Sequence, residues 1–512
     1  VDLVYNGGIG TYVKASSETH AEVGDRANDA LRINGRDLRC KVVAEGGNLG
    51  FTQRGRIEAA LAGVRINTDA IDNSAGVDTS DHEVNIKILL GLAMGDGEMT
   101  DKQRNTLLPQ MTDDVAALVL RDNYFQTQSL SIGGRLAGSL VDQQARFIRY
   151  LEKHGRLNRA IEFLPVDDDI AERKAHGIGL TTPERAVLLA YSKMWLYDEL
   201  LESDLPEDPW VSQALARYFP PLLREKFGAY IPRHPLKREI IATHVVNSMV
   251  NRVGSTFVHR LSETTGARAA QIVRAYLATR EVFGYVDLWL AIEALDNRVA
   301  DEVQAQLLTE LGRLGTRATT WFLRSKRLAE PMEQTFARFR PAVAALRERL
   351  AAEAAASPRA AAWVEAGVPA TLAQQVAMAD GLFAALDVAE IDAASGRGLA
   401  DVAEVHAGLD SRLGLGRLRQ LINALPSESY WQSMAKIALA DDLADLQRAI
   451  TQEVAAGGAA GEGGAAALLA AWEERSRGAI ERAMRLLAEL ADAKSADLAM
   501  LSVALRELRN LA

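Results

Sequence analysis

Residues 41–88 have the sequence KVVAEGGNLGFTQRGRIEAALAGVRINTDAIDNSAGVDTSDHEVNIKI, and this stretch decides the fold. Short apolar runs, each followed by a polar turn that contains glycine, are the predicted strands of this region: residues 1–5, 41–44 and 64–68. Helix-like segments separate these runs: residues 17–31 and 52–61. Short apolar strands that alternate with helices are typical of a parallel sheet covered by helices. Ligands bind such sheets at the carboxyl ends of the strands, where all three polar turns lie.

The sequence changes character near residue 100. From there on, apolar residues recur every three or four positions, which predicts α-helices. The clearest predicted helices are residues 101–130, 136–154, 183–201 and 237–262. Thr182, followed by Pro183 and Glu184, is the predicted start of the third of these helices. The alanine- and glycine-rich residues 455–464 predict a flexible loop before a last helical pair.

These patterns predict an α/β region followed by an all-α region: a partial Rossmann-like parallel sheet with helices, then a large C-terminal helical domain. We expect three parts, at residues 1–130, 131–335 and 336–512, the last rich in alanine. Val1 already lies in a strand pattern. Because domains rarely start within a strand, we expect the chain to be part of a longer protein.

Composition excludes several classes of protein. The 58 Lys and Arg residues against 68 Asp and Glu residues give a formal net charge of -10, which argues against a nucleic-acid partner. Cys40 is the single cysteine, so the chain can form no internal disulfide and a reducing cytoplasm fits. The sequence contains no run of 18 apolar residues, so we expect no membrane-spanning helix. No histidine, cysteine or carboxylate spacing predicts a metal site.

The turn Glu45-Gly46-Gly47-Asn48 has two interpretations. Gly46 and Gly47 allow backbone to approach a ligand, and the Asn48 amide offers a donor and an acceptor. The second interpretation is a plain strand-to-helix turn, and the four residues taken alone favour this second interpretation. They do not form the GxGxxG pattern of a dinucleotide-binding loop.

Ser80 also has two interpretations that do not exclude each other. Ser80 and Glu83 have the spacing of a capping box that would open a helix over residues 81–92. The start of such a helix would also attract an anion, since its free N–H groups and its dipole point outward. His82 lies between the two residues and is predicted to be a packing or surface residue rather than a ligand.

Taken together, these motifs resemble the glutamate dehydrogenases. One group of residues matches the strand-end E-G-A-N pattern and the threonine after it: Glu45, Gly46, Asn48 and Thr52. A second group matches the later N-A-G-G-V pattern with its serine and glutamate: Asn73, Gly76, Val77, Ser80 and Glu83. Stretches such as VYNGGIGTYVKAS and LPVDDDIAERKAHGIGLTTPERAVLLAYSKM resemble the large bacterial NAD-dependent subclass and its helical extension. Gly47, Ser74 and Ala75 depart from the general pattern.

The resemblance implies NAD as the cofactor, with Gly46, Gly47, Asn48 and Asn73 as cofactor-binding residues. It further implies that Asn73 and Ser80 bind the substrate, Ser80 through the side-chain carboxylate of L-glutamate, with 2-oxoglutarate as the product. The family's catalytic lysine and aspartate, and its phosphate-binding loop, would precede Val1, so we expect no catalytic residue in this chain and no activity from the chain alone.

A homo-oligomer is also expected. Two alternatives stay open: a helical assembly or regulatory module of the same enzyme, and a related amino-acid dehydrogenase.

Overall fold

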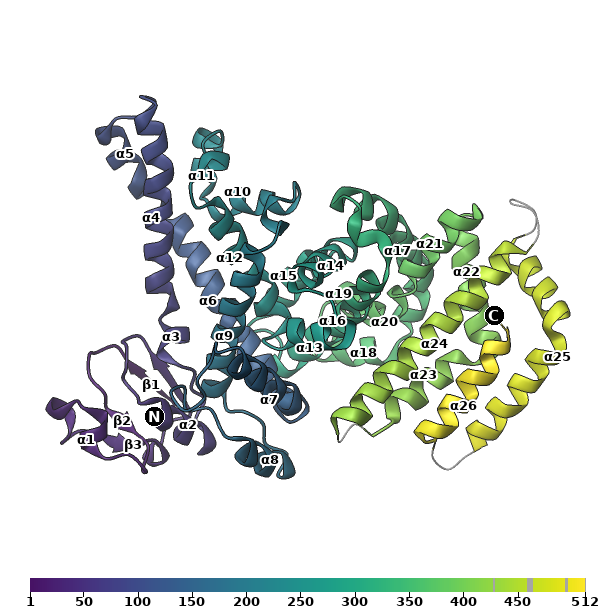
Figure 1. Cartoon of the computed structure of the whole chain (residues 1–512), viewed down its shortest axis with the longest axis horizontal. Helices are drawn as coiled ribbons and strands as arrows, with labels where there is room; N and C mark the ends of the chain where they lie inside the picture. The colour runs from purple at the N-terminus through teal and green to yellow at the C-terminus, as the bar shows by residue number, and fades with distance from the viewer. Residues whose placement is uncertain (427–428, 458–463, 493–495, 512) are drawn as a thin grey trace. The chain divides into compact units, whose positions relative to one another are not determined.

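The computed structural model describes residues 1–426, 429–457, 464–492 and 496–511. The described chain is mostly helical and divides into two compact units, Val1–Tyr276 and Leu277–Ala512 (Figure 1). All strands of the described residues lie in the first 45 residues. The predicted change from α/β to all-α along the chain is therefore confirmed. The division into parts at residues 130 and 335 stays a prediction.

Two small parallel sheets form the β part of the first unit. Strand β1 (Leu3–Asn6) pairs with β4 (Val42–Glu45), with Leu3 opposite Val42 and Asn6 opposite Glu45. Strand β2 (Val13–Lys14) pairs with β3 (Ile33–Asn34). The predicted strand at residues 64–68 contributes only an isolated bridge between Arg65 and Val42. The described residues thus contain small parallel sheets rather than a clear partial Rossmann-like sheet.

The predicted helix over residues 17–31 is wrong. The structure has only the short helix α1 (His20–Val23) and a 3-10 helix, η1 (Arg26–Asn28). Gly24 ends α1 with a left-handed φ of 77°, a conformation that glycine adopts without strain. The chain then extends, and β3 pairs with β2 instead of continuing a helix.

The segment around the polar turns is helical for longer than its sequence predicts. Helix α2 (Gln53–Leu61) agrees with the prediction and is capped by the Thr52 hydroxyl. Helix α3 (Asp69–Asp72) is followed by α4 (Ser74–Gly95). The predicted start of a helix at residue 81 is therefore wrong by seven residues.

The later predicted helices are present with shifted ends. Residues 101–130 form α5 (Asp101–Leu107), the 3-10 helix η3 (Leu108–Met111) and α6 (Thr112–Arg135). Residues 136–154 form α7 (Ala137–Lys153), and α9 covers Thr182–Leu201. Thr181 rather than Thr182 caps α9, because the Glu184 carboxylate accepts hydrogen bonds from the Thr181 N–H and hydroxyl. The predicted helix over residues 237–262 is divided into α12 (Lys237–Val253) and α13 (Phe257–Thr265), and α12 ends at Gly254.

Shorter elements complete the first unit: η2 (Gly35–Asp37), α8 (Asp167–Ala175), η4 (Leu205–Glu207), η5 (Val211–Gln213), α10 (Ala214–Tyr218), α11 (Pro221–Phe227) and η6 (Ile231–Arg233). Helix α14 (Ala269–Val282) crosses from the first unit to the second. No helix of the described residues is long and apolar enough to cross a membrane.

The second unit is helical throughout its described residues. Its elements are α15 (Tyr285–Glu293), α16 (Asp301–Arg324), η7 (Lys326–Ala329), α17 (Met332–Ala355), α18 (Pro358–Glu365), α19 (Ala370–Ala377), α20 (Ala379–Leu382), α21 (Ala385–Ser395), α22 (Leu399–Leu413), α23 (Leu415–Ala424), α24 (Tyr430–Ala456), α25 (Ala465–Asp492), α26 (Leu498–Leu508) and η8 (Arg509–Leu511). Trp472 is fully buried in the core shared by α22, α24, α25 and α26. The last helical pair is confirmed. Of the predicted loop over residues 455–464, Ala455 and Ala456 end α24, and residues 458–463 lie outside the described residues.

Candidate cofactor site

Two glycine-bearing turns meet at one edge of the β1–β4 pair. Because the strands are parallel, the turn after Asn6 and the turn after Glu45 leave the sheet side by side. The Gly47 N–H donates to the Asn6 carbonyl over 2.9 Å. A Cβ atom on Gly47 would lie 2.4 Å from the Gly8 carbonyl oxygen, so the close packing of the two turns requires glycine there. This packing supports the interpretation that Gly47 serves a strand-to-helix turn. A contact of Gly47 with the cofactor stays a prediction.

The structure brings Asn48 and Asn73 into direct contact. The Asn73 Nδ2 atom donates a hydrogen bond to Asn48 Oδ1 over 2.7 Å, and this pair is exposed. Leu49 follows Asn48 with a left-handed φ of 60°, and its N–H donates to Asp69 Oδ2 over 2.8 Å. The turn is therefore held to α3, and the two amides predicted to bind the cofactor share one small surface.

A buried ionic network supports this turn from below. Glu45 is fully buried and accepts two hydrogen bonds from Arg56, at 2.7 and 3.0 Å. Arg56 also pairs with Asp69 over 3.1 Å, and Asp72 accepts from the Glu45 N–H over 2.9 Å. Burial raises the pKa of Glu45, and the Arg56 guanidinium opposes that rise. The network fixes the end of β4 against the two turns of chain that carry Asn48 and Asn73.

Sequence reasoning missed this network. Arg56 shares the buried face of α2 with Gly55 and Ala59, and an arginine on a buried helix face usually signals a paired carboxylate. Asp72 immediately precedes Asn73, and Asp69 lies one helical turn before it. These acidic residues were the available signal that the turn carries an ion pair beneath it.

Helices α6 and α9 hold the start of α4 beside Asn73. Asn123 of α6 donates to the Ile71 carbonyl over 2.8 Å and to Ser74 Oγ over 3.0 Å. Gln126, one turn on, donates to the same Ser74 oxygen over 3.3 Å and accepts from Lys193 Nζ of α9 over 3.1 Å. A chain of hydrogen bonds thus links α9 to the residue that follows Asn73.

Charged groups with shifted pKa values lie along this contact. Burial raises the pKa of Asp78 in α4 to about 6, and the carboxylate of Asp122 in α6 adds to the rise. Burial lowers the pKa of Lys193 to about 8, and Asp122 and Asp78 oppose that fall. The Lys193 side chain thus interacts with the carboxyl groups of Asp78 and Asp122, and burial disfavours the charged form of all three groups.

The structure places Ser80 differently from its prediction. Ser80 lies in the second turn of α4, exposed to solvent, and Glu83 forms an ion pair with Lys87. The predicted capping box is therefore wrong, because contacts with α6 start the helix seven residues earlier. The free N–H groups and the positive end of the α4 dipole therefore lie at Asn73 and Ser74 and not at Ser80.

His82 is a packing residue, as one predicted alternative held. It is buried, its ring stacks on Tyr218 with centroids 4.2 Å apart, and burial lowers its pKa. The Tyr218 hydroxyl donates to Asp81 Oδ2 over 2.7 Å. These contacts attach the middle of α4 to α10.

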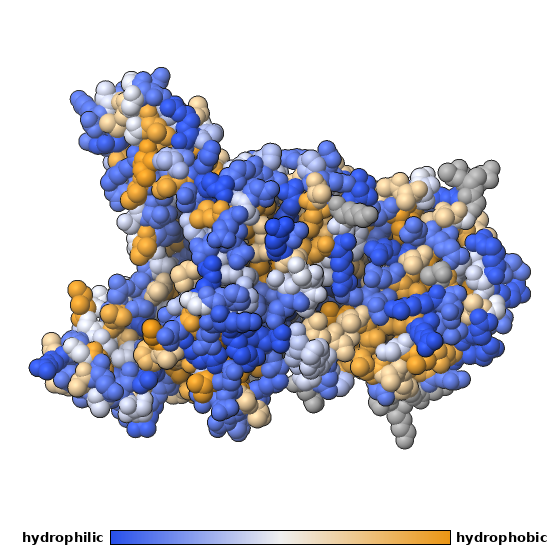
Figure 2. Space-filling view, in the orientation of Figure 1, coloured by the Kyte–Doolittle hydropathy of each residue, from blue (hydrophilic) through white to orange (hydrophobic). Residues whose placement is uncertain are grey.

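The opposite face of α4 is open. Asn73, Val77, Ser80 and Val84 recur at spacings of three and four residues, so they share one face of the helix. Val77 is 76% exposed and Val84 is 52% exposed, and Figure 2 shows hydrophobic residues among hydrophilic ones along this helix. Ser80 lies about 10 Å from Asn73 along the helix axis.

Comparison with known proteins places these features in a family. A family model described as bacterial NAD-glutamate dehydrogenase, catalytic domain, matches residues 1–133, and one described as glutamate dehydrogenase, C-terminal, matches residues 177–510. The chain belongs to the bacterial NAD-glutamate dehydrogenase family. It is 47% identical to the NAD-specific glutamate dehydrogenase of Pseudomonas aeruginosa, 45% to that of Halomonas elongata and 40% to that of Mycobacterium tuberculosis. Each match covers all of this chain and 32% of the relative, so the chain spans about a third of their length.

The two matched family segments meet at the start of α4. Asn73, Asp78 and Gln126 lie in the segment that matches the catalytic domain of bacterial NAD-glutamate dehydrogenases. Lys193 lies in the segment that matches the C-terminal model. The hydrogen bond between Lys193 and Gln126 therefore joins the two segments close to the predicted cofactor residues.

Proposed function

We propose that this chain is the C-terminal part of an NAD-dependent glutamate dehydrogenase. The whole protein would convert L-glutamate, NAD and water into 2-oxoglutarate, ammonium and NADH. One observation carries the proposal: the hydrogen-bonded pair of Asn48 and Asn73 at the carboxyl end of β4, where parallel sheets bind ligands. The three relatives are NAD-specific glutamate dehydrogenases by name, which supports NAD as the cofactor and glutamate as the substrate.

The residues of the site fit a dinucleotide. The missing Cβ atoms of Gly46 and Gly47 make room for Tyr5 and for the Gly8 carbonyl, so the two glycines would serve a dinucleotide site by letting the turns pack closely. Asn48 and Asn73 offer amide groups at the surface, and their mutual hydrogen bond fixes which way each amide faces. Bound NAD would supply the acceptor for the hydride that leaves the substrate α-carbon, and these residues would orient its nicotinamide end.

Ser80 and the open face of α4 fit the substrate. A glutamate whose α-carbon lies near Asn73 could extend along α4, so that its side-chain carboxylate accepts a hydrogen bond from the Ser80 hydroxyl. Val77 lies between the two positions and would contact the methylene groups of the substrate. A related amino-acid dehydrogenase acting on apolar substrates would gain nothing from a hydroxyl at this position, which makes it the weaker alternative.

The rest of the proposal concerns groups outside the chain. The lysine and aspartate for acid–base chemistry would come from the other two thirds of the longer protein. We also propose that the protein forms a homo-oligomer and that it lies in the cytoplasm. The buried Cys40, which forms no disulfide, is compatible with the reducing cytoplasm. The second candidate function, a helical assembly or regulatory module, has one supporting observation: Lys193 of the C-terminal segment reaches the start of α4 through Gln126.

An activity assay tests the proposal. The full-length protein that contains this chain is expected to form NADH from NAD only when L-glutamate is added, and the isolated 512-residue chain is expected to form none. NADH formation by the isolated chain above a buffer blank would contradict the assignment of the acid–base groups to the rest of the protein. Glutamate-independent NAD use, or none, by the full-length protein would contradict the proposed activity.

A further inference from the structure

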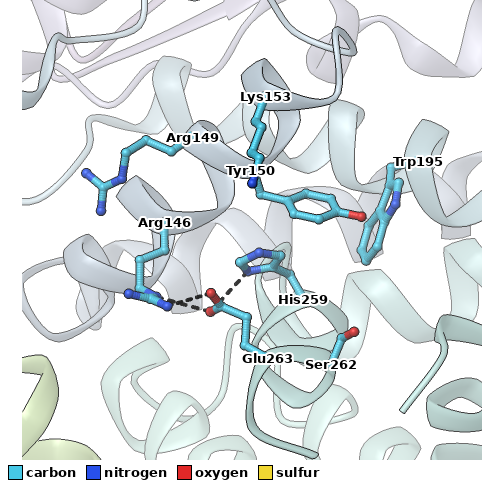
Figure 3. Close-up of a pocket in the computed structure, with 8 residues that line it drawn as sticks. All are labelled: Arg146, Arg149, Tyr150, Lys153, Trp195, His259, Ser262 and Glu263. Carbon is cyan, nitrogen blue, oxygen red and sulfur yellow. Dashed lines mark hydrogen bonds and ion pairs between the residues drawn. The ribbon is translucent and has the colours of Figure 1, made fainter. Parts of the chain in front are cut away.

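A basic pocket lies in the helical part of the first unit, lined by one face of α7 with α9 and α13 (Figure 3). Its volume is about 350 Å³, within the size range of small-molecule sites. Arg146, Arg149 and Lys153 are three and four residues apart and therefore line one side of α7. Glu263 of α13 is the single acidic residue among the lining groups. Positive charge therefore exceeds negative charge among the lining residues, and Arg149 also pairs with Asp167, which is not among them, over 3.2 Å.

The aromatic floor of the pocket is built from two rings of different helices. Tyr150 of α7 and Trp195 of α9 have ring centroids 5.6 Å apart in an edge arrangement. The Tyr150 ring also lies 4.7 Å from the ring of His259. Figure 3 shows the guanidinium groups of Arg146 and Arg149 to the left of these three rings and the Lys153 side chain beside Tyr150. Such a site can hold a flat ring and a negative charge at once.

The acidic residue in the pocket is held by a basic one. Arg146 donates two hydrogen bonds to the Glu263 carboxylate, at 2.6 and 3.1 Å. His259 is buried, and its Nδ1 atom, which has no hydrogen-bond partner among the described residues, lies 3.6 Å from the same carboxylate. An anion that bound Arg146 would release Glu263 toward this unsatisfied nitrogen. Arg146 can thus exchange the Glu263 carboxylate for a bound anion, because His259 lies near enough to bind the displaced carboxylate.

We propose that this pocket binds a small organic oxyanion that carries a flat ring, with the carboxylate or phosphate among Arg146, Arg149 and Lys153 and the ring against Tyr150 and Trp195. The site is distinct from the Asn48–Asn73 pair and goes beyond the proposed dehydrogenase function. A charge-assisted hydrogen bond to Arg146 would give affinity, and the aromatic floor would select for a ring.

Calorimetric titration of the chain with three probes tests the ring and the oxyanion separately. Phenyl phosphate and benzoate carry both parts, whereas inorganic phosphate carries only the charge. At least one of the two ring compounds is expected to bind more tightly than inorganic phosphate, and whichever of the two binds more tightly identifies phosphate or carboxylate as the preferred oxyanion. Equal binding of all three probes, or no binding of any, would overturn the proposal.

Variants of the lining residues locate the binding. The double change Arg149→Ala with Lys153→Ala is expected to weaken binding of the preferred ring compound by about tenfold or more. Arg477→Ala is the matched control, because Arg477 is an exposed arginine that pairs with Glu474 far along the chain in the second unit. Equal affinities in the double variant and the control would overturn the location of the site.

Glu263→Gln gives the sharpest test, because its effect has the opposite sign. Removing the negative charge frees Arg146 from its competing acceptor, so binding of the ring compound is expected to tighten by about threefold or more. A melting curve verifies that the variant is folded. Should Glu263→Gln bind no more tightly than the unchanged chain, the exchange between Glu263 and the ligand would be overturned.

Discussion

Asn73 donates a hydrogen bond from Nδ2 to Asn48 Oδ1 over 2.7 Å, which joins two turns that are 25 residues apart in the sequence. The contact depends on the buried network below it, since Asp69 holds Leu49 and Asp72 holds Glu45.

Gly47 and Gly46 are expected to differ in their tolerance of alanine. A Cβ on Gly47 would meet the Gly8 carbonyl, which is backbone, at 2.4 Å. Gly47→Ala is therefore expected to lower the free energy of unfolding by about 1–3 kcal/mol. A Cβ on Gly46 would meet the side chain of Tyr5, nearest at its hydroxyl at 2.0 Å, and Tyr5 is 68% exposed and free to turn away. Urea unfolding of both variants measures the difference, and equal losses would contradict the packing of the two turns.

The ion pair of Glu45 with Arg56 is expected to be essential for folding stability. Arg56→Met leaves the fully buried Glu45 carboxylate without its counter-charge and is expected to cost about 3–5 kcal/mol. Lys41→Met is the matched control, because Lys41 pairs with Asp2 in an ion pair that is exposed on both sides. Its cost is expected to stay within about 0.5 kcal/mol. Similar unfolding free energies for the two variants would refute the role of the network.

Asp78 is expected to make stability fall as the pH rises from about 4 to about 6. Its pKa is raised from 3.8 to about 6, so in this window the folded protein holds a proton that the unfolded chain has released. Asp78→Asn is expected to remove that slope and to gain at most about 3 kcal/mol at pH 7. Denaturation at pH 4, 5, 6 and 7 measures the change. The exposed Asp113→Asn serves as the control, and identical pH profiles for the two variants would be inconsistent with a strained Asp78 carboxyl.

Ser80→Val in the full-length protein is expected to separate substrates. A hydrogen bond to the substrate carboxylate is worth roughly 1.5–3 kcal/mol, so kcat/KM for glutamate should fall by about 10- to 150-fold. Norvaline lacks that carboxylate and should lose far less. Because Ser80 is exposed within α4 and caps no helix, the melting temperature should hardly change. Equal losses for both amino acids would remove Ser80 from the substrate site.

The sequence predicted the parts of the site that depend on strand order. Parallel strands with polar turns at their carboxyl ends were predicted, and the turns after β1 and β4 lie at that shared edge. Asn48 and Asn73 are in contact, and their role in cofactor binding stays a prediction. The packing role of His82 was also among the alternatives.

The sequence could not predict features that distant residues determine. The start of α4 depends on Asn123, which satisfies the Ile71 carbonyl and Ser74 from 49 or more residues away. The local capping pattern at Ser80 and Glu83 was therefore misleading. The failed helix over residues 17–31 has a similar cause, because pairing of β3 with β2 extends the chain where local periodicity favours a helix.

The most direct test of the account is a double-mutant cycle on the asparagine pair. NAD affinity would be measured by calorimetry in the full-length protein with Asn48→Ala, Asn73→Ala, both changes, and the exposed control Asn105→Ala. Each single change is expected to weaken NAD binding by about five- to tenfold, and the double change by less than the product of the two, since they share one hydrogen bond. Unchanged NAD affinity in both folded single variants would contradict the claim that Asn48 and Asn73 hold the cofactor.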